Sequence, residues 1–268
     1  MEARLMTWNL WWQFGPWRER QSAILATIRQ EQPDIVCLQE VFEQEGGLNQ
    51  AAWIAEELGL YVVHTEGPWY DGISFGNAIL SRWPLISSQE HRLPQVDGLP
   101  GHRRAITAEI DTPYGRWWVV STHLDHKFDA SVTRLGQCEA LCSIVDSLRR
   151  DPENESPVLM AGDFNAVPDS DEIRMLTGRK EPAIAGLVFT DSWEVAGEGD
   201  GFTWRRDNPY IAETTWPNRR LDYVFVSWPR PKPMGNPVRA WLAGCEAVDG
   251  VQPSDHAALV VDLQMISL

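Results

Sequence analysis

The chain has 268 residues, of which 43% are hydrophobic and 23% are charged. This composition is typical of a folded globular protein and excludes a chain that is disordered over most of its length. Lys and Arg together number 23 against 38 Asp and Glu, which gives a formal net charge of −15. Such a balance argues against a protein that coats nucleic acid through phosphate neutralisation, and no extended basic track is expected.

Two features bear on where the protein works. No apolar run approaches the ~20 residues that a membrane-spanning helix needs, so no transmembrane segment is expected. The first residues, from Met1 to Leu5, lack the basic and apolar regions of a secretory signal, so we expect a cytoplasmic protein. Four cysteines are too sparse for a disulfide scaffold, and buried thiols are expected instead.

Short apolar strands alternate along the chain with a few helical patterns. Strands are predicted at 5–10, 35–40, 78–80, 105–110, 116–123, 157–162, 221–227, 239–245 and 257–263, and helices at 21–30, 49–58 and 132–148. Many strands and few helices favour a layered α/β fold with more than one sheet. No repeat or domain boundary is visible, so residues 1–268 are expected to form a single domain.

Polar side chains stand at the ends of these apolar strands, which is the most informative feature of the sequence. They are Asn9, Glu40, His123, Asp125, Asp163, Asn165, Asp222, Asp255 and His256. Strand ends on one side of a sheet converge in space, and ligands bind there in open α/β folds. We therefore expect these side chains to form one site.

The residue types in this set point to a particular chemistry. Carboxylates and an amide, with no Cys ligand, suit a hard cation such as Mg²⁺ or Mn²⁺. A carboxylate such as Asp222 can bond one imidazole nitrogen of His256 and fix its tautomer. Asp163 could orient a water for attack on phosphorus, and the two His could contact phosphate oxygens or move protons. Together these groups predict metal-assisted hydrolysis of a phosphoester.

Seven segments occur in an order that resembles a known family. They are TWN, LQEVF, GNAILSRWP, STHLDHK, GDFNAVPDS, RLDYVFVS and SDHAALVVDL. Together they resemble the signature blocks of the endonuclease/exonuclease/phosphatase superfamily of DNase I-like, metal-dependent phosphoesterases. The resemblance spans Thr7 to Leu263 and is strongest to the small bacterial members. It implies a four-layer α/β/β/α sandwich with two mixed β-sheets face to face.

The resemblance also implies a role for each residue around the metal. Glu40 matches the principal metal ligand, and Asn9 and Asp255 match neighbours of the metal that act directly or through water. Asp163 matches the residue that activates the attacking water. The implied cofactor is Mg²⁺ or Mn²⁺.

The remaining matched residues belong to the phosphate side of the site. His123 and Asn165 match residues that hold the scissile phosphate. Asp222 and His256 match an Asp–His pair beside that phosphate. This interpretation therefore predicts that Asp222 and His256 are in contact, although they lie far apart in the sequence.

Several residues near these blocks stay open at this point. Asn77 and Asp125 fall in family blocks, but their roles vary between branches. Trp11, Trp12 and Trp17 follow Asn9, and they could equally line the substrate cleft or anchor the loop to the core. Some basic and imidazole side chains lie outside the strand ends. We expect Arg103 and Arg104 to form a solvated strand end rather than to steer a phosphate, and one of Arg219 and Arg220 to lie near the site. We expect His64, His91 and His102 to be structural and His126 to pack or cap.

The substrate is not fixed by the sequence. LQEVF differs from the LQETK of abasic-site nucleases, and RRLDYV stands where inositol-polyphosphate 5-phosphatases carry WCDRI. We expect a phosphodiester rather than a monoester, in a small molecule, a lipid headgroup or a nucleic acid. A nuclease acting on DNA or RNA is the first alternative, disfavoured by the net negative charge, and a non-catalytic binding protein on the same fold is the second. A monomer is expected.

Overall fold

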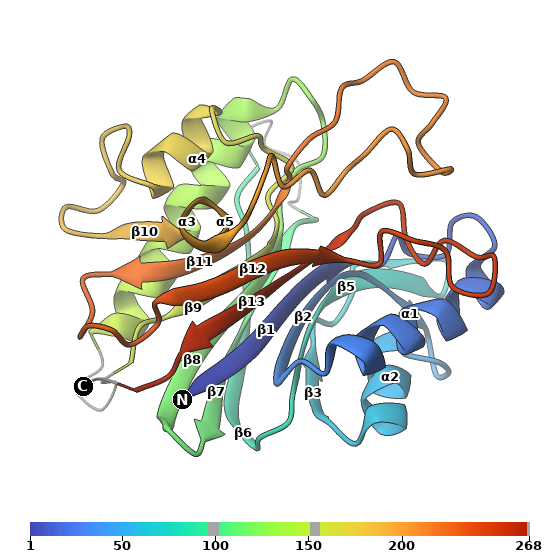
Figure 1. The fold of residues 1–268 in the computed structure, drawn as a ribbon, viewed down its shortest axis with the longest axis horizontal. Helices are drawn as coiled ribbons and strands as arrows, with labels where there is room; N and C mark the ends of the chain where they lie inside the picture. The colour runs from blue at the N-terminus through green and yellow to red at the C-terminus, as the bar shows by residue number, and fades with distance from the viewer. Residues whose placement is uncertain (96–101, 151–155, 267–268) are drawn as a thin grey trace.

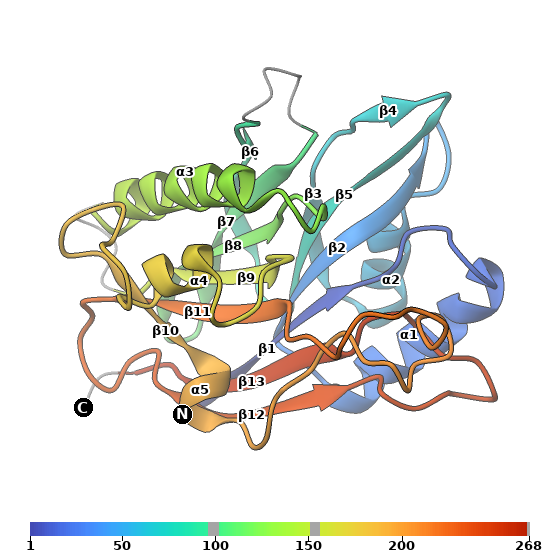
Figure 2. The same cartoon turned by 90° about the horizontal axis from the view of Figure 1, so that it is seen from above.

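The computed structural model describes residues 1–95, 102–150 and 156–266. Two β-sheets stack face to face, and helices lie on the outer face of each sheet (Figures 1 and 2). Both sheets are mixed, because each contains one parallel strand pair among antiparallel ones. The four-layer α/β/β/α sandwich expected from the sequence is confirmed.

Among the described residues, the first sheet has seven strands and contains the first and the last strand of the chain. Its strands are β1 (Glu2–Asn9), β2 (Ile35–Gln44), β3 (Tyr61–His64), β4 (Trp69–Tyr70), β5 (Ile73–Ser81), β12 (Pro237–Ala243) and β13 (Ala258–Gln264). They are ordered β12-β13-β1-β2-β5-β3, with β4 paired to β5. Strands β1 and β2 are parallel and central, so their C-terminal ends lie at the same edge of the sheet.

The second sheet has six strands in the order β10-β11-β9-β8-β7-β6. They are β6 (Leu85–Arg92), β7 (Arg104–Thr112), β8 (Gly115–His123), β9 (Leu159–Asp163), β10 (Val188–Asp191) and β11 (Asp222–Trp228). Strands β8 and β9 are parallel, and β11 runs antiparallel to β9. The ends of β8 and β9 therefore meet the beginning of β11.

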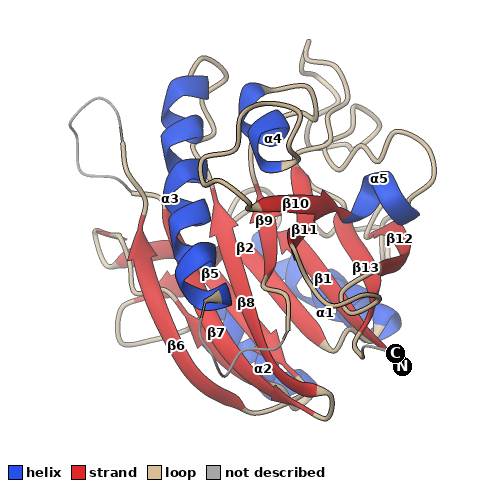
Figure 3. Cartoon of the chain, turned by 90° about the vertical axis from the view of Figure 1, so that its left-hand side faces the viewer, coloured by secondary structure: helices blue, strands red, loops and turns tan. Residues whose placement is uncertain are grey.

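Helices α1 (Trp17–Glu31) and α2 (Gln50–Leu58) cover the first sheet, and α3 (Ser131–Arg149) and α4 (Asp171–Leu176) cover the second (Figure 3). The short α5 (Ser192–Ala196) contacts β11 and β12. Helix α2 begins where the Asn49 side chain accepts a bond from the Ala52 amide, and it ends at Gly59 in the left-handed conformation. None of the helices among the described residues is long and apolar enough to cross a membrane.

Side chains alternate along each strand between the core that lies between the sheets and a core beneath the helices. In β1, Leu5 lies between the sheets and Met6 packs under α1 and α2. In β9, Leu159 lies between the sheets and Met160 packs under α3 and α4. By this alternation the polar residues that end or begin four strands also face the space between the sheets: Asn9, His123, Asp163 and Asp222.

The elements missing from the sequence analysis are short or lie at edges. They are β3, β4, β6, β10, α4 and α5. Strand β6 reads LISSQEHR and is largely exposed, so it lacks the apolar residues that predict a strand. These omissions leave the positions of the predicted site residues unchanged.

Candidate active site

Asp163 lies at the centre of a cluster of polar residues between the two sheets. It ends β9 and pairs in register with His123 of β8 on one side and Asp222 of β11 on the other. Its side chain is 1% exposed. Its Oδ2 lies 3.4 Å from Nε2 of His123 and 3.9 Å from Nε2 of His256. One carboxylate oxygen therefore faces both imidazoles.

Asn9 connects this carboxylate to the first sheet. Its Nδ2 donates to Oδ2 of Asp163 at 3.0 Å and to Oε1 of Glu40 at 3.2 Å. Its Oδ1 accepts from the backbone amide of Trp11 at 2.9 Å. Because an amide hydrogen fixes the oxygen end of Asn9, the nitrogen end must face the two carboxylates.

Glu40 reaches the site through a local departure from strand geometry. Alternation from Cys37, which lies between the sheets, would turn residue 40 toward the helices. Instead the pairing of β2 with β5 shifts register between Leu38 and Val41, and Glu40 has a φ of +52°. This bulge turns Glu40 toward Asn9, and 22% of its side chain stays exposed. A left-handed non-glycine residue costs backbone energy, which is typical of functional positions.

Asp222 and His256 are in direct contact, as the sequence analysis requires. Oδ2 of Asp222 lies 2.8 Å from Nδ1 of His256, and both side chains are buried. Burial opposes protonation of His256, but the charges of Asp222, Asp255 and Asp163 outweigh it and hold the pKa of the imidazole well above its usual range. Trp8 donates from Nε1 to the carbonyl oxygen of His256 at 2.9 Å and so fixes its backbone.

His123 has an arginine partner that the sequence analysis placed elsewhere. Arg103 was expected to be a solvated strand end, but its Nη1 lies 2.8 Å from Nδ1 of His123 and its Nη2 lies 3.0 Å from Nδ1 of His126. An arginine only donates, so Nδ1 of His123 accepts and the ring proton sits on Nε2, facing Asp163. Burial and the charge of Arg103 hold the pKa of His123 well below its usual range. Residue 103 precedes β7, and no pattern in the sequence predicts its contact with His123.

Asn165 follows Asp163 in a tight turn. Its backbone amide donates to Oδ1 of Asp163 at 2.8 Å, and its φ is +50°. Its Nδ2 donates to the carbonyl oxygen of Leu124 at 3.1 Å, which leaves the second amide hydrogen for another partner. The turn thus places an amide donor next to the central carboxylate.

The loop after Asn9 is held by Arg20, a contact that no sequence pattern indicates. Arg20 is fully buried and donates to the carbonyl oxygens of five residues: Leu10, Trp11, Trp12, Phe14 and Pro253. Trp12 donates from Nε1 to the carbonyl oxygen of Ser74, and Trp11 stacks on Tyr210. These contacts show that Trp11 and Trp12 anchor the loop.

Asn77 and Asp125 make contacts of a structural kind. Asn77 donates from Nδ2 to the carbonyl oxygen of Arg104 at 2.7 Å, which ties β5 of one sheet to β7 of the other. Oδ1 of Asp125 accepts from the backbone amide of Lys127 at 2.9 Å and forms an Asx turn. Of the two arginines before β11, Arg220 is buried and pairs with Asp191 at 2.6 Å. Arg219 and Arg220 both line a pocket beside Asn165.

The cluster carries more negative than positive charge. Burial and the charge of Asp222 raise the pKa of Asp163 to about 7. Burial and the charge of Glu40 raise the pKa of Asp255 to about 6. Carboxylates that repel one another in a buried cluster fit a bound cation, because the positive charge of the cation would compensate their negative charges. The carboxylates of Glu40, Asp163, Asp222 and Asp255 offer only oxygen atoms as metal ligands, and this suits Mg²⁺ or Mn²⁺.

One compact group of possible ligands for such a cation is found among the described residues, and Glu40 lies outside it. Single atoms of Asp163, Asp222 and His256 lie within 4.8 Å of one another. In that group Nδ1 of His256 is already bonded to Asp222. Glu40 and Asp255 are the partly exposed carboxylates, and an ion from solvent can reach them. We therefore favour the Glu40 side for the cation and the Asp222–His256 side for the phosphate.

Residues 6–256 match the model of the Endonuclease/Exonuclease/phosphatase family. Nocturnin of Drosophila melanogaster is 29% identical over 93% of this chain and 42% of its own length, and nocturnin of Xenopus laevis is 26% identical over 92% and 64%. The chain thus spans less than two thirds of these relatives. A crystal structure of an endonuclease/exonuclease/phosphatase from Beutenbergia cavernae has a TM-score of 0.76 at 27% identity and covers 99% of this chain and 72% of that one.

The human nocturnin catalytic domain with bound sulfate has a TM-score of 0.75 at 24% identity over 98% of this chain and 94% of that one, and it supports the fold. The family match covers most of the chain and every strand-end residue described above. The chain belongs to the endonuclease/exonuclease/phosphatase family, whose members are metal-dependent phosphoesterases and nucleases.

Proposed function

We propose that this protein hydrolyses phosphodiesters with the help of Mg²⁺ or Mn²⁺. The observation that carries the proposal is the position of Asp163 between two imidazoles and the Asn9 amide, on the face where Glu40 also points. This arrangement combines a buried carboxylate that can take a proton with donors that can hold a phosphate.

Glu40 and Asp255 are the residues that would hold the cation directly. Asn9 presents its nitrogen to Glu40, so it would position the carboxylates or act through water. A bound divalent cation would supply positive charge that polarises a phosphate oxygen.

The remaining residues divide the reaction between them. Asp163 orients the attacking water and accepts its proton, a task that suits a carboxyl whose pKa is raised to about 7. His123 and Asn165 donate to the phosphate oxygens and stabilise the charge that they gain in the transition state. His256, held protonated by Asp222, binds the phosphate or passes a proton to the leaving group.

The substrate class follows from charge and from the family. A net charge of −15 disfavours a long polyanion and favours a small or single-stranded phosphodiester. A nuclease stays the alternative, since the family includes endonucleases and exonucleases. A non-catalytic binding protein is disfavoured because Glu40, His123, Asp163 and His256 are all retained. A monomer of one domain and a cytoplasmic location also stay predictions.

An aryl phosphodiester assay with and without EDTA tests the proposal directly. We expect Mg²⁺ or Mn²⁺ to restore the activity that EDTA removes. Activity that is indifferent to chelation would contradict the metal role. Parallel assays on supercoiled DNA, RNA oligonucleotides, sphingomyelin and inositol phosphates rank the substrate classes, and efficient nicking of plasmid DNA would favour the nuclease.

A further inference from the structure

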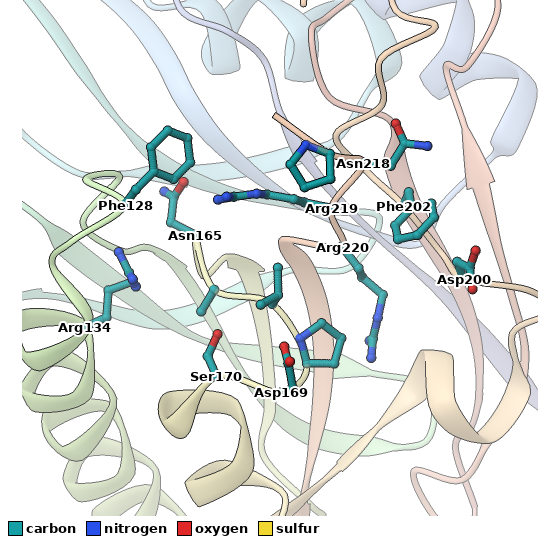
Figure 4. Close-up of a pocket in the computed structure, with 14 residues that line it drawn as sticks. Phe128, Arg134, Asn165, Asp169, Ser170, Asp200, Phe202, Asn218, Arg219 and Arg220 are labelled. Atoms are coloured by element: carbon teal, nitrogen blue, oxygen red, sulfur yellow. The ribbon is translucent and has the colours of Figure 1, made fainter. Parts of the chain in front are cut away.

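A pocket of about 460 Å³ adjoins the reaction centre on the side of the second sheet. Asn165 forms one wall, and Arg219 and Arg220, which precede β11, form another (Figure 4). The floor is formed by residues 166–170, between β9 and α4. Asn165 both lines this pocket and donates from its backbone amide to the Asp163 carboxylate, so it connects the pocket to the reaction centre.

Three arginines line the pocket, and two of them are neutralised by partners. Arg134 bonds Oε1 of Glu172 at 2.9 Å, and Arg220 bonds Oδ2 of Asp191 at 2.6 Å. Both of these ion pairs are buried. These two side chains therefore serve the fold as well as the pocket.

Arg219 differs because, among the described residues, its guanidinium has no acidic partner. Its backbone is fixed by reciprocal bonds with Trp204. The guanidinium lies 4.3 Å from the ring centroid of Phe128 and 4.9 Å from that of Trp216, and both rings are partly exposed. Within the part of the chain that the structure describes, no carboxylate or carbonyl oxygen accepts a bond from it. Its donors are thus oriented by aromatic rings and available to a ligand.

Charge in the pocket favours an anion next to Arg219. Burial and the charge of Arg134 lower the pKa of Arg219, so the two cations repel each other. An anion in the pocket would relieve this repulsion. Arg219 extends across the pocket toward Asn165 (Figure 4). The carboxylates Asp169 and Asp200 also line the pocket, but both are exposed to solvent, which screens their charges.

We propose that this pocket binds a second phosphate of the substrate, next to the phosphate that is hydrolysed, and that Arg219 is the residue that recognises it. The inference rests on the proposed function, because the first phosphate must occupy the reaction centre. Guanidinium groups pair with phosphate through two parallel hydrogen bonds, and Phe128 and Trp216 orient that fork. The substrate class is then a phosphodiester that carries a further phosphate group.

Calorimetric titration tests this second phosphate site by measuring ligand binding, without relying on catalytic activity. The wild-type chain, saturated with Mg²⁺, is titrated with alkyl monophosphates and with diol bisphosphates of increasing spacer length, for example butyl phosphate and butanediol bisphosphate. We expect one spacer length to bind at least about tenfold more tightly than its monophosphate, as a charge-assisted bond predicts. Adenosine bisphosphate and inositol bisphosphate then distinguish a nucleotide from a lipid headgroup as the source of the second phosphate.

Arg219→Met keeps the apolar stem against the rings and removes the charge. We expect it to reduce the ratio of the two affinities to about one. Arg29→Ala is the matched control, because it removes one positive charge from the exposed surface of α1 and should leave the ratio and the activity unchanged. Equal affinities for every spacer length, or an unchanged ratio in Arg219→Met, would overturn the proposal.

The two proposals fail in different ways. A wild-type protein that prefers bisphosphates but hydrolyses no phosphodiester would contradict the proposed function and leave the second subsite supported. A protein that hydrolyses the aryl phosphodiester but binds both ligand types equally would contradict the second subsite alone.

Discussion

The reaction centre and the pocket beside it are neighbours that are built in different ways. The side chains of the centre stand at strand ends, face the space between the sheets, and are mostly buried and bonded to one another. The pocket is lined by loop residues and by Arg134 of α3, and the two rings against Arg219, Phe128 and Trp216, are exposed. The sheets thus fix the groups that perform the reaction, whereas the loops are free to select the substrate.

Of the substitutions considered, Gly162→Ala should disrupt the reaction centre most, because the added methyl group would force apart β8 and β9, which carry His123 and Asp163. A Cβ at this position would lie 1.9 Å from the carbonyl oxygen of Thr122, and the φ of +151° disfavours a side chain. We expect a loss of about 3 kcal/mol in the free energy of unfolding, measured by urea denaturation. The matched control is Gly136→Ala in α3, where a Cβ meets no atom within 4 Å and helix propensity rises. Equal stability of the two variants would show that the approach of β8 and β9 is not tight.

Asp163→Asn should abolish the activity and spare the fold. The replacement can still accept from Asn9, and the raised pKa of Asp163, about 7, shows that its surroundings do not favour the charged form. We expect kcat on the aryl phosphodiester to fall about a thousandfold with an unchanged Tm, as loss of a general base predicts. A variant that retains a tenth of the activity would remove Asp163 from the central role.

Much of this centre can be predicted from the sequence, for a physical reason. A buried strand alternates strictly, so a polar residue that ends an apolar run in phase with it must lie between the sheets, as His123 and Asp163 do. Glu40 was placed in the site because it ends an apolar run, and the resemblance supplied its role as metal ligand. Strict alternation gives it the wrong face, and the bulge that corrects this could not be predicted. The contacts of Arg103 and Arg20 depend on loop conformations that follow no period, so no pattern predicts them. For the pocket, the sequence indicated only that Arg219 or Arg220 lies near the site.

Asp222→Asn and His256→Ala should each reduce kcat, by about a hundredfold. Asn keeps the shape of Asp222 but cannot stabilise a protonated imidazole, and Ala removes the imidazole. Because the two side chains are bonded at 2.8 Å and act as one unit, the double variant should be little worse than either single one. Losses that multiply in the double variant would show that the two residues act independently.

Arg103 should have a smaller effect, since it acts through His123. Arg103→Met removes the donor that holds the His123 proton on Nε2. We expect kcat to fall about tenfold with little change in KM, as for other residues that orient a site side chain. Arg103→Lys, which keeps a donor, should recover part of the rate. A rise in KM at constant kcat would show instead that Arg103 binds the substrate.

The central claim is that Glu40 holds a divalent cation at the edge of the strand-end cluster. Titration calorimetry of Mg²⁺ into the wild-type chain, Glu40→Gln and Asp222→Asn tests it most directly, with Asp171→Asn on the exposed surface of α4 as the control. The account predicts that Glu40→Gln raises the Kd at least about a hundredfold, whereas Asp222→Asn and the control bind as the wild type does. Normal binding by Glu40→Gln together with loss in Asp222→Asn would place the cation among Asp163, Asp222 and His256 and contradict the account.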